Sequence, residues 1–263
     1  MHKMDYKNLF NYEGKRVFVI GGNGGIGGAI AEGFAAVGCK VAIVGRNAEK
    51  TQKKADEIKE ATGAEVKVYA ADASSEDDVK ALAEAVKADF GGIDILVNSQ
   101  GINKKSPVKD QPVDVWDAMF AANVRSIMLT QKYFTPMMEE QKWGRVINVS
   151  SIGAVRCKGD DISTAYGATK GAVNAITLNS CPQLAKSNIT INNIAPIMTR
   201  TEMMIPIFAA NPALETGTAA RVPAGRIGQP EDCAGIALCL ASDAMAFVTG
   251  QVFYADGGLC TQQ

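Results

Sequence analysis

A tyrosine and a lysine stand one helical turn apart in the segment AYGATKGA, at Tyr166 and Lys170. Residues four apart on a helix have Cβ atoms roughly 5–6 Å apart, so the phenol would lie beside the ammonium group. A neighbouring cation favours the phenolate and lowers the pKa of a tyrosine from its usual value of about 10. The sequence contains one histidine, His2. Tyr166 is therefore a candidate general base, although an ordinary aromatic ring beside a solvated lysine would show the same spacing.

A glycine-rich segment, GGNGGIGG, begins at Gly21 directly after the β-branched run RVFVI and opens a helical pattern. Glycines allow the backbone to turn tightly and to approach a pyrophosphate, whose charge then lies at the helix N-terminus. One register, G-x-G-x-x-G, uses Gly22, Gly24 and Gly27. The other, G-x-x-x-G-x-G, uses Gly21, Gly25 and Gly27. In this context the segment favours a dinucleotide site over a merely flexible turn.

The end of the second expected strand bears on the choice of cofactor. An acidic residue at this place accepts a hydrogen bond from the ribose 2′-hydroxyl of NAD. This sequence has Gly45 and Arg46 instead, and the first acidic residue is Glu49. A guanidinium group matches the geometry of a phosphate, so Arg46 favours the 2′-phosphate of NADP, with NAD as the alternative. An arginine that points into water is the other interpretation.

Short β-branched runs alternate with amphipathic helical segments along the chain, which predicts a parallel sheet with helices on both faces. Strands are expected at residues 16–20, 40–44, 65–69, 94–97, 145–149 and 190–195, with a seventh at 251–255. Long helices are expected at about residues 113–140 and 164–186. In a doubly wound sheet of this Rossmann type, ligands bind outside the carboxyl ends of the strands, where the motifs of this sequence fall.

The chain shows no linker-like segment or break in composition, so a single α/β domain over residues 1–263 is expected. Residues 1–14 form an N-terminal extension in this interpretation, and a mobile substrate lid is expected at about residues 199–222.

Charge and hydropathy exclude several classes of partner. The net charge is −1, from 27 basic and 28 acidic residues, so a nucleic-acid partner is not indicated. The most basic segment, KTQKK at residues 50–54, is expected to be a solvated helix face. No apolar run is long enough to cross a bilayer, and the N-terminus lacks the apolar core of a signal peptide. We therefore expect a cytoplasmic protein with a small-molecule substrate and no membrane partner.

The 6 cysteines are scattered, without a CxxC pair. They are expected to be reduced thiols, mostly small buried hydrophobic residues, and no metal site is expected.

Further polar and glycine motifs lie at the ends of the other expected strands. They are Asp72 after the third strand, NSQG after the fourth, NVSSIG after the fifth, IAP after the sixth, Asn123 in the first long helix and a terminal ADGG. Combined with YGATK and the glycine loop in its G-x-x-x-G-x-G register, this set resembles the short-chain dehydrogenase/reductase family over nearly the whole chain. The resemblance implies hydride transfer between a nicotinamide cofactor and a secondary alcohol or ketone. It also implies a homotetramer with an interface on the two long helices.

The resemblance implies a role for each of four catalytic side chains. Tyr166 would be the acid/base, and Lys170 would lower its pKa and hold the nicotinamide ribose. Ser151 would hydrogen-bond the substrate oxygen, and Asn123 would hold a water for proton relay. Asp72 would contact the adenine and Asn98 the loop beside the ribose. The implied cofactor contacts are Gly21, Asn23, Gly25, Ile26, Gly27, Arg46, Asp72, Ala73, Asn98, Gly101, Tyr166, Lys170, Pro196 and Thr199.

Some positions depart from the family pattern near the cofactor. Ile20 stands where threonine is usual, and NSQG places Ser99 and Gln100 where the family usually has asparagine and alanine. Ile197 replaces the glycine that normally follows the proline of IAP. None of these changes removes a catalytic side chain.

The loop GINKKSP after the fourth strand is expected to border the substrate, and it is most similar to the gluconate 5-dehydrogenase group of the family. Lys104 and Lys105 could pair with a carboxylate, and Arg156 and Asp160 could bond hydroxyl groups. The expected substrate contacts are Lys104, Lys105, Ser151, Arg156 and Tyr166. A solvated loop is the other interpretation of the lysine pair.

Other functions stay open at this point. The apolar lid sequence EMMIPIFAA would also suit a 3-oxoacyl thioester or a hydroxysteroid. A dinucleotide-sensing protein without turnover is a remote alternative, because both the tyrosine and the lysine are present.

Overall fold

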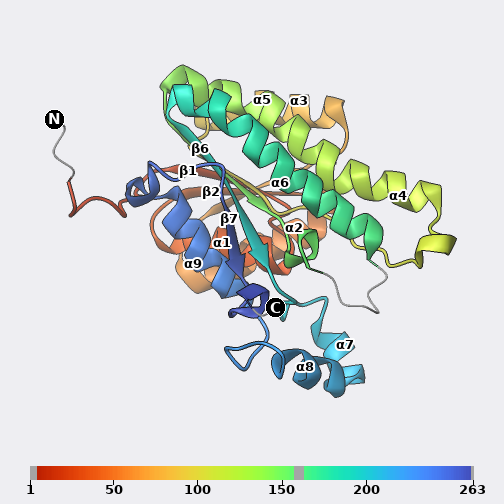
Figure 1. Ribbon diagram of the computed structural model, residues 1–263. Coiled ribbons are helices and arrows are strands. Elements are labelled where there is room, and N and C mark those ends of the chain that lie inside the picture. Colours follow the sequence, from red (N-terminus) through yellow and green to blue (C-terminus); the bar gives the residue numbers. More distant parts are fainter. Residues whose placement is uncertain (1–4, 157–162, 262–263) are drawn as a thin grey trace.

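The structure, a computed structural model, describes residues 5–156 and 163–261. Within these residues it contains one sheet of parallel strands in the order β3-β2-β1-β4-β5-β6-β7 (Figure 1). The strands are β1 (Arg16–Ile20), β2 (Lys40–Gly45), β3 (Val66–Ala70), β4 (Ile95–Asn98), β5 (Gly144–Val149), β6 (Ile189–Pro196) and β7 (Val252–Ala255). Every expected strand is confirmed, with ends that differ by no more than one residue. The doubly wound, Rossmann-type α/β class is likewise confirmed.

Helices cover both faces of the sheet (Figure 1). One face carries α1 (Gly25–Ala36), α2 (Ala48–Thr62) and α9 (Pro230–Ala241). The other carries α3 (Glu76–Phe90), α5 (Ser126–Gln141) and α6 (Thr164–Leu184), with α4 (Val113–Phe120) leading into α5. The chain order reverses between β1 and β4, so the switch point lies beside the end of β1. The short helices α7 (Ile205–Ala210) and α8 (Pro212–Ala219) follow β6 and lie within residues 199–222, for which the lid stays a prediction.

Local sequence explains where several helices begin and end. The side chain of Asn47 accepts a hydrogen bond from the Lys50 amide at the start of α2, and Ser75 caps α3 in the same way through Asp78. Glycines end both helices in the left-handed region, with φ +75° at Gly63 and +71° at Gly91. Such caps pair the amide and carbonyl groups that a helix leaves unbonded at its ends.

The expected uninterrupted helix over residues 113–140 is wrong in one detail. A turn of π-helix, Ala121–Arg125, separates α4 from α5. Turns of this kind insert one extra residue and redirect side chains, often at functional sites. Here the turn places Asn123 in the interior, with no exposed surface.

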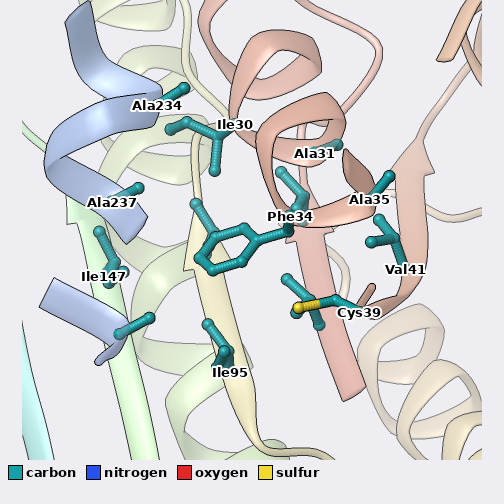
Figure 2. Packing of buried hydrophobic residues seen from close by; sticks show 14 of the residues in the cluster. Ile30, Ala31, Phe34, Ala35, Cys39, Val41, Ile95, Ile147, Ala234 and Ala237 are labelled. Carbon is teal, nitrogen blue, oxygen red and sulfur yellow. The ribbon is translucent and has the colours of Figure 1, made fainter. Parts of the chain in front are cut away.

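The larger core cluster lies between the sheet and the helices α1 and α9 that cover one of its faces. Figure 2 shows Phe34 of α1 at its centre, between Ile95 and Ile147 of the sheet and Ala237 of α9. Phe34 has no exposed surface, and full burial of such a side chain contributes about 1.5–3 kcal/mol. Since both faces of the sheet are covered, its central strands are apolar on both sides, as their sequences predicted.

A second feature of the interior is polar. Hydrogen bonds of 2.5 to 2.9 Å between side chains cross the carboxyl ends of β4, β5 and β6. In order, they connect Thr130, Asn98, Asn148, Thr177, Asn193 and Asn174. Ser150 donates to the same Asn174 oxygen at 2.7 Å. This network joins α5, three strand ends and α6 into one unit next to Ser151.

The cysteine prediction is met only in part. All described cysteines are free, but only Cys39 and Cys233 are buried. Cys181 and Cys260 are half-buried and Cys239 is exposed, while Cys157 lies outside the described residues. Across the described residues, no helix is long and apolar enough to span a membrane, and no cluster of possible metal ligands occurs.

We expect Asn148→Ala to lower the free energy of unfolding by about 2 kcal/mol, because it leaves the buried Asn98 amide donor without an acceptor and removes the bond that Asn148 donates to Thr177, whose hydroxyl keeps its bond to Asn193. Urea unfolding measures this loss. Asn179→Ala, at an exposed asparagine of α6, is the matched control and should change stability by less than about 0.5 kcal/mol. Equal effects of the two variants would contradict the importance of the network.

Candidate active site

The predicted catalytic side chains meet at the carboxyl edge of the sheet. Ser151 follows β5 and begins a short turn, where its Oγ accepts a hydrogen bond from the Gly153 amide at 3.1 Å. Tyr166 lies in the first turns of α6, and its ring and Ser151 both border Gly153: a Cβ atom at Gly153 would lie 3.4 Å from Ser151 Oγ and 3.7 Å from Tyr166 Cδ1. A serine and a tyrosine placed this close can together hold one oxygen atom of a substrate.

Lys170 lies one turn further along α6, with 4% of its surface exposed. Its Nζ donates to the Val149 carbonyl at 2.7 Å and stands 5.6 Å from the centroid of the Tyr166 ring. Burial lowers the pKa of Lys170 to about 8. The ammonium group therefore titrates near the physiological range.

The expectation that Lys170 lowers the pKa of Tyr166 is not met in this arrangement. Burial raises the pKa of Tyr166, and the hydrogen bond from Ser151 opposes this shift without reversing it. The reason is geometric, since a backbone carbonyl holds the ammonium group and the same desolvation acts on both side chains.

The side chain of Asn123 hydrogen-bonds the backbone of the loop after β4. Its Oδ1 accepts from the Ile102 amide at 2.7 Å, and its Nδ2 donates to the Ile102 carbonyl at 2.9 Å and to Thr169 Oγ1 at 3.0 Å. A Cβ atom at Gly101 would lie 3.0 Å from Asn123 Oδ1 and 3.7 Å from Lys170 Nζ. The side chain thus fixes the loop after β4 beside Lys170, and the predicted contact with a relay water stays a prediction.

The glycine loop shows which of its two registers is used. Gly21 has φ +76°, and a Cβ atom there would lie 2.7 Å from the Gln100 amide nitrogen. A Cβ atom at Gly27 would lie 2.3 Å from the Gly21 carbonyl oxygen, whereas one at Gly24 would meet nothing nearer than 3.5 Å. Gly22 is closed as well, since its Cβ atom would lie 2.6 Å from Ile43 Cγ2, so Gly24 alone separates the two registers. All three glycines of the G-x-x-x-G-x-G register, Gly21, Gly25 and Gly27, lack room for a side chain.

Thr201 is a site residue that the sequence analysis missed. It rests on the first turn of α1, where a Cβ atom at Gly25 would lie 2.6 Å from Thr201 Cβ. Its Oγ1 is buried without a hydrogen-bond partner among the described residues. A buried hydroxyl without a partner is costly, so its place beside the glycine loop indicates a ligand group there. The repeat TRT, which includes the predicted Thr199, is the sequence signal that could have drawn attention to it.

The other predicted cofactor residues lie in the glycine loop and at the ends of β2, β3 and β6. Asn23 donates to Thr51 Oγ1 at 2.9 Å, and Arg46 is exposed beyond the end of β2. Burial acts to raise the pKa of Asp72, but hydrogen bonds from Ser74 and the charges of Arg46 and Arg125 outweigh it and lower that pKa. Ile26 and Ala73 pack against the two core clusters, Pro196 ends β6, and Thr199 is buried with its Oγ1 bonded to the Ile197 carbonyl.

One assignment requires correction. The Asn98 side chain is fully buried in the polar network, so it supports the end of β4 and cannot contact a cofactor directly. The guanidinium group of Arg156 donates to the Leu259 carbonyl and so holds the C-terminal segment, and its predicted bond to substrate hydroxyls stays a prediction. Lys104 and Lys105 are exposed on the loop after β4, and Asp160 lies outside the described residues.

This set of residues fits a bound dinucleotide. The glycines leave no room for side chains where the loop opens α1, and the helix N-terminus and the unpartnered Thr201 hydroxyl suit a pyrophosphate. A proton-transferring tyrosine beside such a loop is the arrangement of a nicotinamide-dependent oxidoreductase.

Comparison with known proteins agrees with this class. A family model described as enoyl-(acyl carrier protein) reductase matches residues 21–260. The chain belongs to the short-chain dehydrogenase/reductase family and is an oxidoreductase.

Individual relatives span almost the whole chain. The 5-keto-D-gluconate 5-reductase of Escherichia coli K12 is 32% identical over 96% of this chain and 98% of its own length. The 3-oxoacyl-[acyl-carrier-protein] reductase of Vibrio cholerae is also 32% identical, over 95% and 98%. The crystal structure of a gluconate 5-dehydrogenase from Burkholderia cenocepacia, in complex with NADP and tartrate, superposes with a TM-score of 0.90 at 31% identity, over 97% of this chain and 99% of that one.

The lowered pKa of Lys170 predicts a pH dependence of stability. Between about pH 8 and the unfolded-chain pKa of about 10.4, the unfolded chain binds a proton at this residue that the folded chain has lost. The free energy of unfolding contributed by Lys170 therefore rises with pH across this window. In urea unfolding at pH 8 and pH 9.5, we expect the wild-type protein to gain stability relative to Lys170→Met. A difference between the two proteins that is independent of pH would contradict the lowered pKa.

Proposed function

We propose that this protein is an NADP-dependent oxidoreductase that interconverts a secondary alcohol and a ketone on a sugar acid or polyol. The observation that carries the reaction class is the placement of Ser151 and Tyr166 on either side of Gly153 at the sheet edge, 3.4 and 3.7 Å from where a Cβ atom of Gly153 would lie.

Each side chain has a distinct part in this reaction. NADP, when bound, supplies or accepts the hydride. In reduction Tyr166 Oη gives its proton to the carbonyl oxygen, and in oxidation it takes the proton from the hydroxyl. Ser151 holds that oxygen in place, and the ammonium group of Lys170 would hold the nicotinamide ribose. The raised pKa of Tyr166 keeps the phenol protonated, which suits it to act as the acid in ketone reduction.

The end of β2 supports NADP. A Cβ atom at Gly45 would lie 2.3 Å from Asn23 Nδ2 and 2.6 Å from Thr51 Oγ1, so this position is closed to any side chain, including the acid typical of NAD sites. The next residue is the exposed Arg46, which suits a 2′-phosphate.

The substrate class rests on weaker ground than the reaction. The relatives named for gluconate chemistry and the exposed pair Lys104 and Lys105 support an anionic polyol, since ammonium groups pair with a carboxylate. A second candidate, a 3-oxoacyl thioester or hydroxysteroid, is favoured by the apolar lid. Its Met203 is 75% exposed and Ile205 is 45% exposed, and equal identity to the Vibrio cholerae enzyme leaves both candidates in place.

We also propose a cytoplasmic homotetramer in which residues 199–222 act as the substrate lid and residues 1–14 as an N-terminal extension. The exposed Met128 on α5 and Leu178 on α6 support an interface on the two long helices. Sedimentation velocity gives the mass that tests it.

The first test is the initial rate of NADPH formation with D-gluconate at mildly alkaline pH, with NAD in a parallel assay. We expect turnover with NADP that falls by orders of magnitude in Tyr166→Phe, since the variant retains the ring but not the transferable proton. The variant should still bind NADPH, since the ring and the other cofactor contacts remain. A protein that binds NADPH but shows no rate on gluconate keeps the reaction class and moves the substrate to other polyols or to acyl ketones. A biological activity that survives Tyr166→Phe would favour the dinucleotide-sensing alternative.

Arg46→Leu tests the cofactor assignment. Removing the guanidinium group should weaken NADPH binding by roughly tenfold or more, since a charge-assisted hydrogen bond contributes about 1.5–3 kcal/mol, and should leave NADH binding nearly unchanged. Fluorescence titration of the two cofactors measures the ratio. Equal losses for both would show that Arg46 does not read the 2′-phosphate.

A further inference from the structure

The segment KTQKK does not form the uniformly solvated helix face that the sequence predicted. Lys54 of α2 has a side chain that is only 16% exposed, whereas Lys53 next to it is 80% exposed. The aliphatic stem of Lys54 crosses α1, where a Cβ atom at Gly28 would lie 3.1 Å from Lys54 Cδ. Its ammonium group thereby lies between α2 and the segment after β6.

That ammonium group reaches the lid. Lys54 Nζ lies 2.6 Å from Glu202 Oε1, a carboxylate 148 residues away along the chain, and also pairs with Glu57 on its own helix. The lysine is therefore held between one carboxylate of α2 and one at the start of the lid.

Glu202 directly follows Thr201, whose side chain rests on Gly25 in the glycine loop. We call residues 199–202, where the lid begins, the lid root. Two consecutive residues of the lid root, Thr201 and Glu202, thus contact α1 and α2. On the other side of this root, Thr199 bridges to Gly228, and Arg200 pairs with Glu215 of α8. Residues 199–202 are therefore held at several points. Among the ion pairs of the described residues, the Lys54–Glu202 pair is the one that joins this segment to the half of the sheet that carries the glycine loop.

We propose that Lys54 is a positioning residue for the lid, and that its ion pair with Glu202 holds the lid root on the glycine loop so that the Thr201 hydroxyl stands ready for the pyrophosphate. The proposal rests on the proposed binding of NADP. Its physical basis is preorganisation, because a root already held in place has less conformational entropy to lose when the cofactor binds. Lys54 contacts neither the reacting atoms nor a predicted catalytic residue in this role.

The charges of Lys54 and Glu202 allow the direction of a change in NADPH affinity to separate two explanations. Glu202 is an anion close to the site of a polyanionic cofactor, so removing its charge would tighten NADPH binding if only long-range electrostatics mattered. Loss of the anchor would weaken NADPH binding instead. The two explanations therefore predict opposite shifts for Glu202→Gln, a change that preserves size and shape.

We expect Glu202→Gln to raise the Kd for NADPH roughly threefold to tenfold in a fluorescence titration, and Lys54→Met to raise it at least as much. The double variant should bind no more weakly than Lys54→Met alone, because the two changes break one interaction. Glu57→Gln is the matched control, since it removes the other partner of Lys54 without touching the lid, and its Kd should stay within about twofold of the wild-type value.

Limited trypsin digestion without NADPH gives a second readout. The lid has no lysine or arginine between Arg200 and Arg221, so cleavage at these two residues reports release of its ends. Cleavage should be faster in Glu202→Gln than in wild type or Glu57→Gln, at an unchanged melting temperature. An unchanged rate, or an unchanged or lower Kd for Glu202→Gln, overturns the proposal. A wild-type protein that fails to bind NADPH overturns the proposed function instead, and the digestion then still decides whether the pair anchors the lid.

Discussion

The structure depends on one constraint at the carboxyl edge of its sheet: polar side chains that are buried there must find their partners inside the protein. Asn98, Asn148 and Asn193 each stand near the end of a different strand and have no access to water. Their side-chain amides are hydrogen-bonded in a row, Asn98 to Asn148 directly and Asn148 to Asn193 through Thr177. The row ends at Asn174 of α6, which also accepts a hydrogen bond from Ser150. Because an unpaired buried amide is costly, the strand ends and α6 keep one relative position. This position in turn fixes where Ser151, at the end of β5, lies relative to Tyr166 and Lys170 of α6.

Burial also determines the electrostatics of the site. Coulomb attraction alone would make Tyr166 more acidic beside Lys170, but desolvation acts against the charged form of both groups. It raises the pKa of the phenol and lowers that of the ammonium group to about 8, so the two values move apart. The phenol of Tyr166 therefore stays protonated to a higher pH than the ammonium group of Lys170 does.

The cofactor side of the site relies on contacts that allow no side chain. At Gly21 and Gly27 a Cβ atom would strike backbone, and at Gly25 it would strike Thr201 of the lid root. The same glycine that opens the loop to a pyrophosphate therefore also receives the lid. The proposed cofactor site and the proposed lid therefore meet at Gly25, next to the ion pair of Lys54 with Glu202.

The sequence by itself determined the strands, the parallel sheet and the pairing of Tyr166 with Lys170, because hydrophobic periodicity and helical spacing are local properties of the chain. Ser151 and Asn123 became candidates through the resemblance to the family. It could not determine which of two glycine registers is used, since that depends on how closely Gln100 and other distant segments approach. Nor could it predict that Arg156 would hold the C-terminus, that Thr201 would be buried or that Lys54 would leave its solvated helix face. These outcomes belong to the tertiary structure, because the partner of a long side chain and the balance of burial against charge depend on residues far away in sequence.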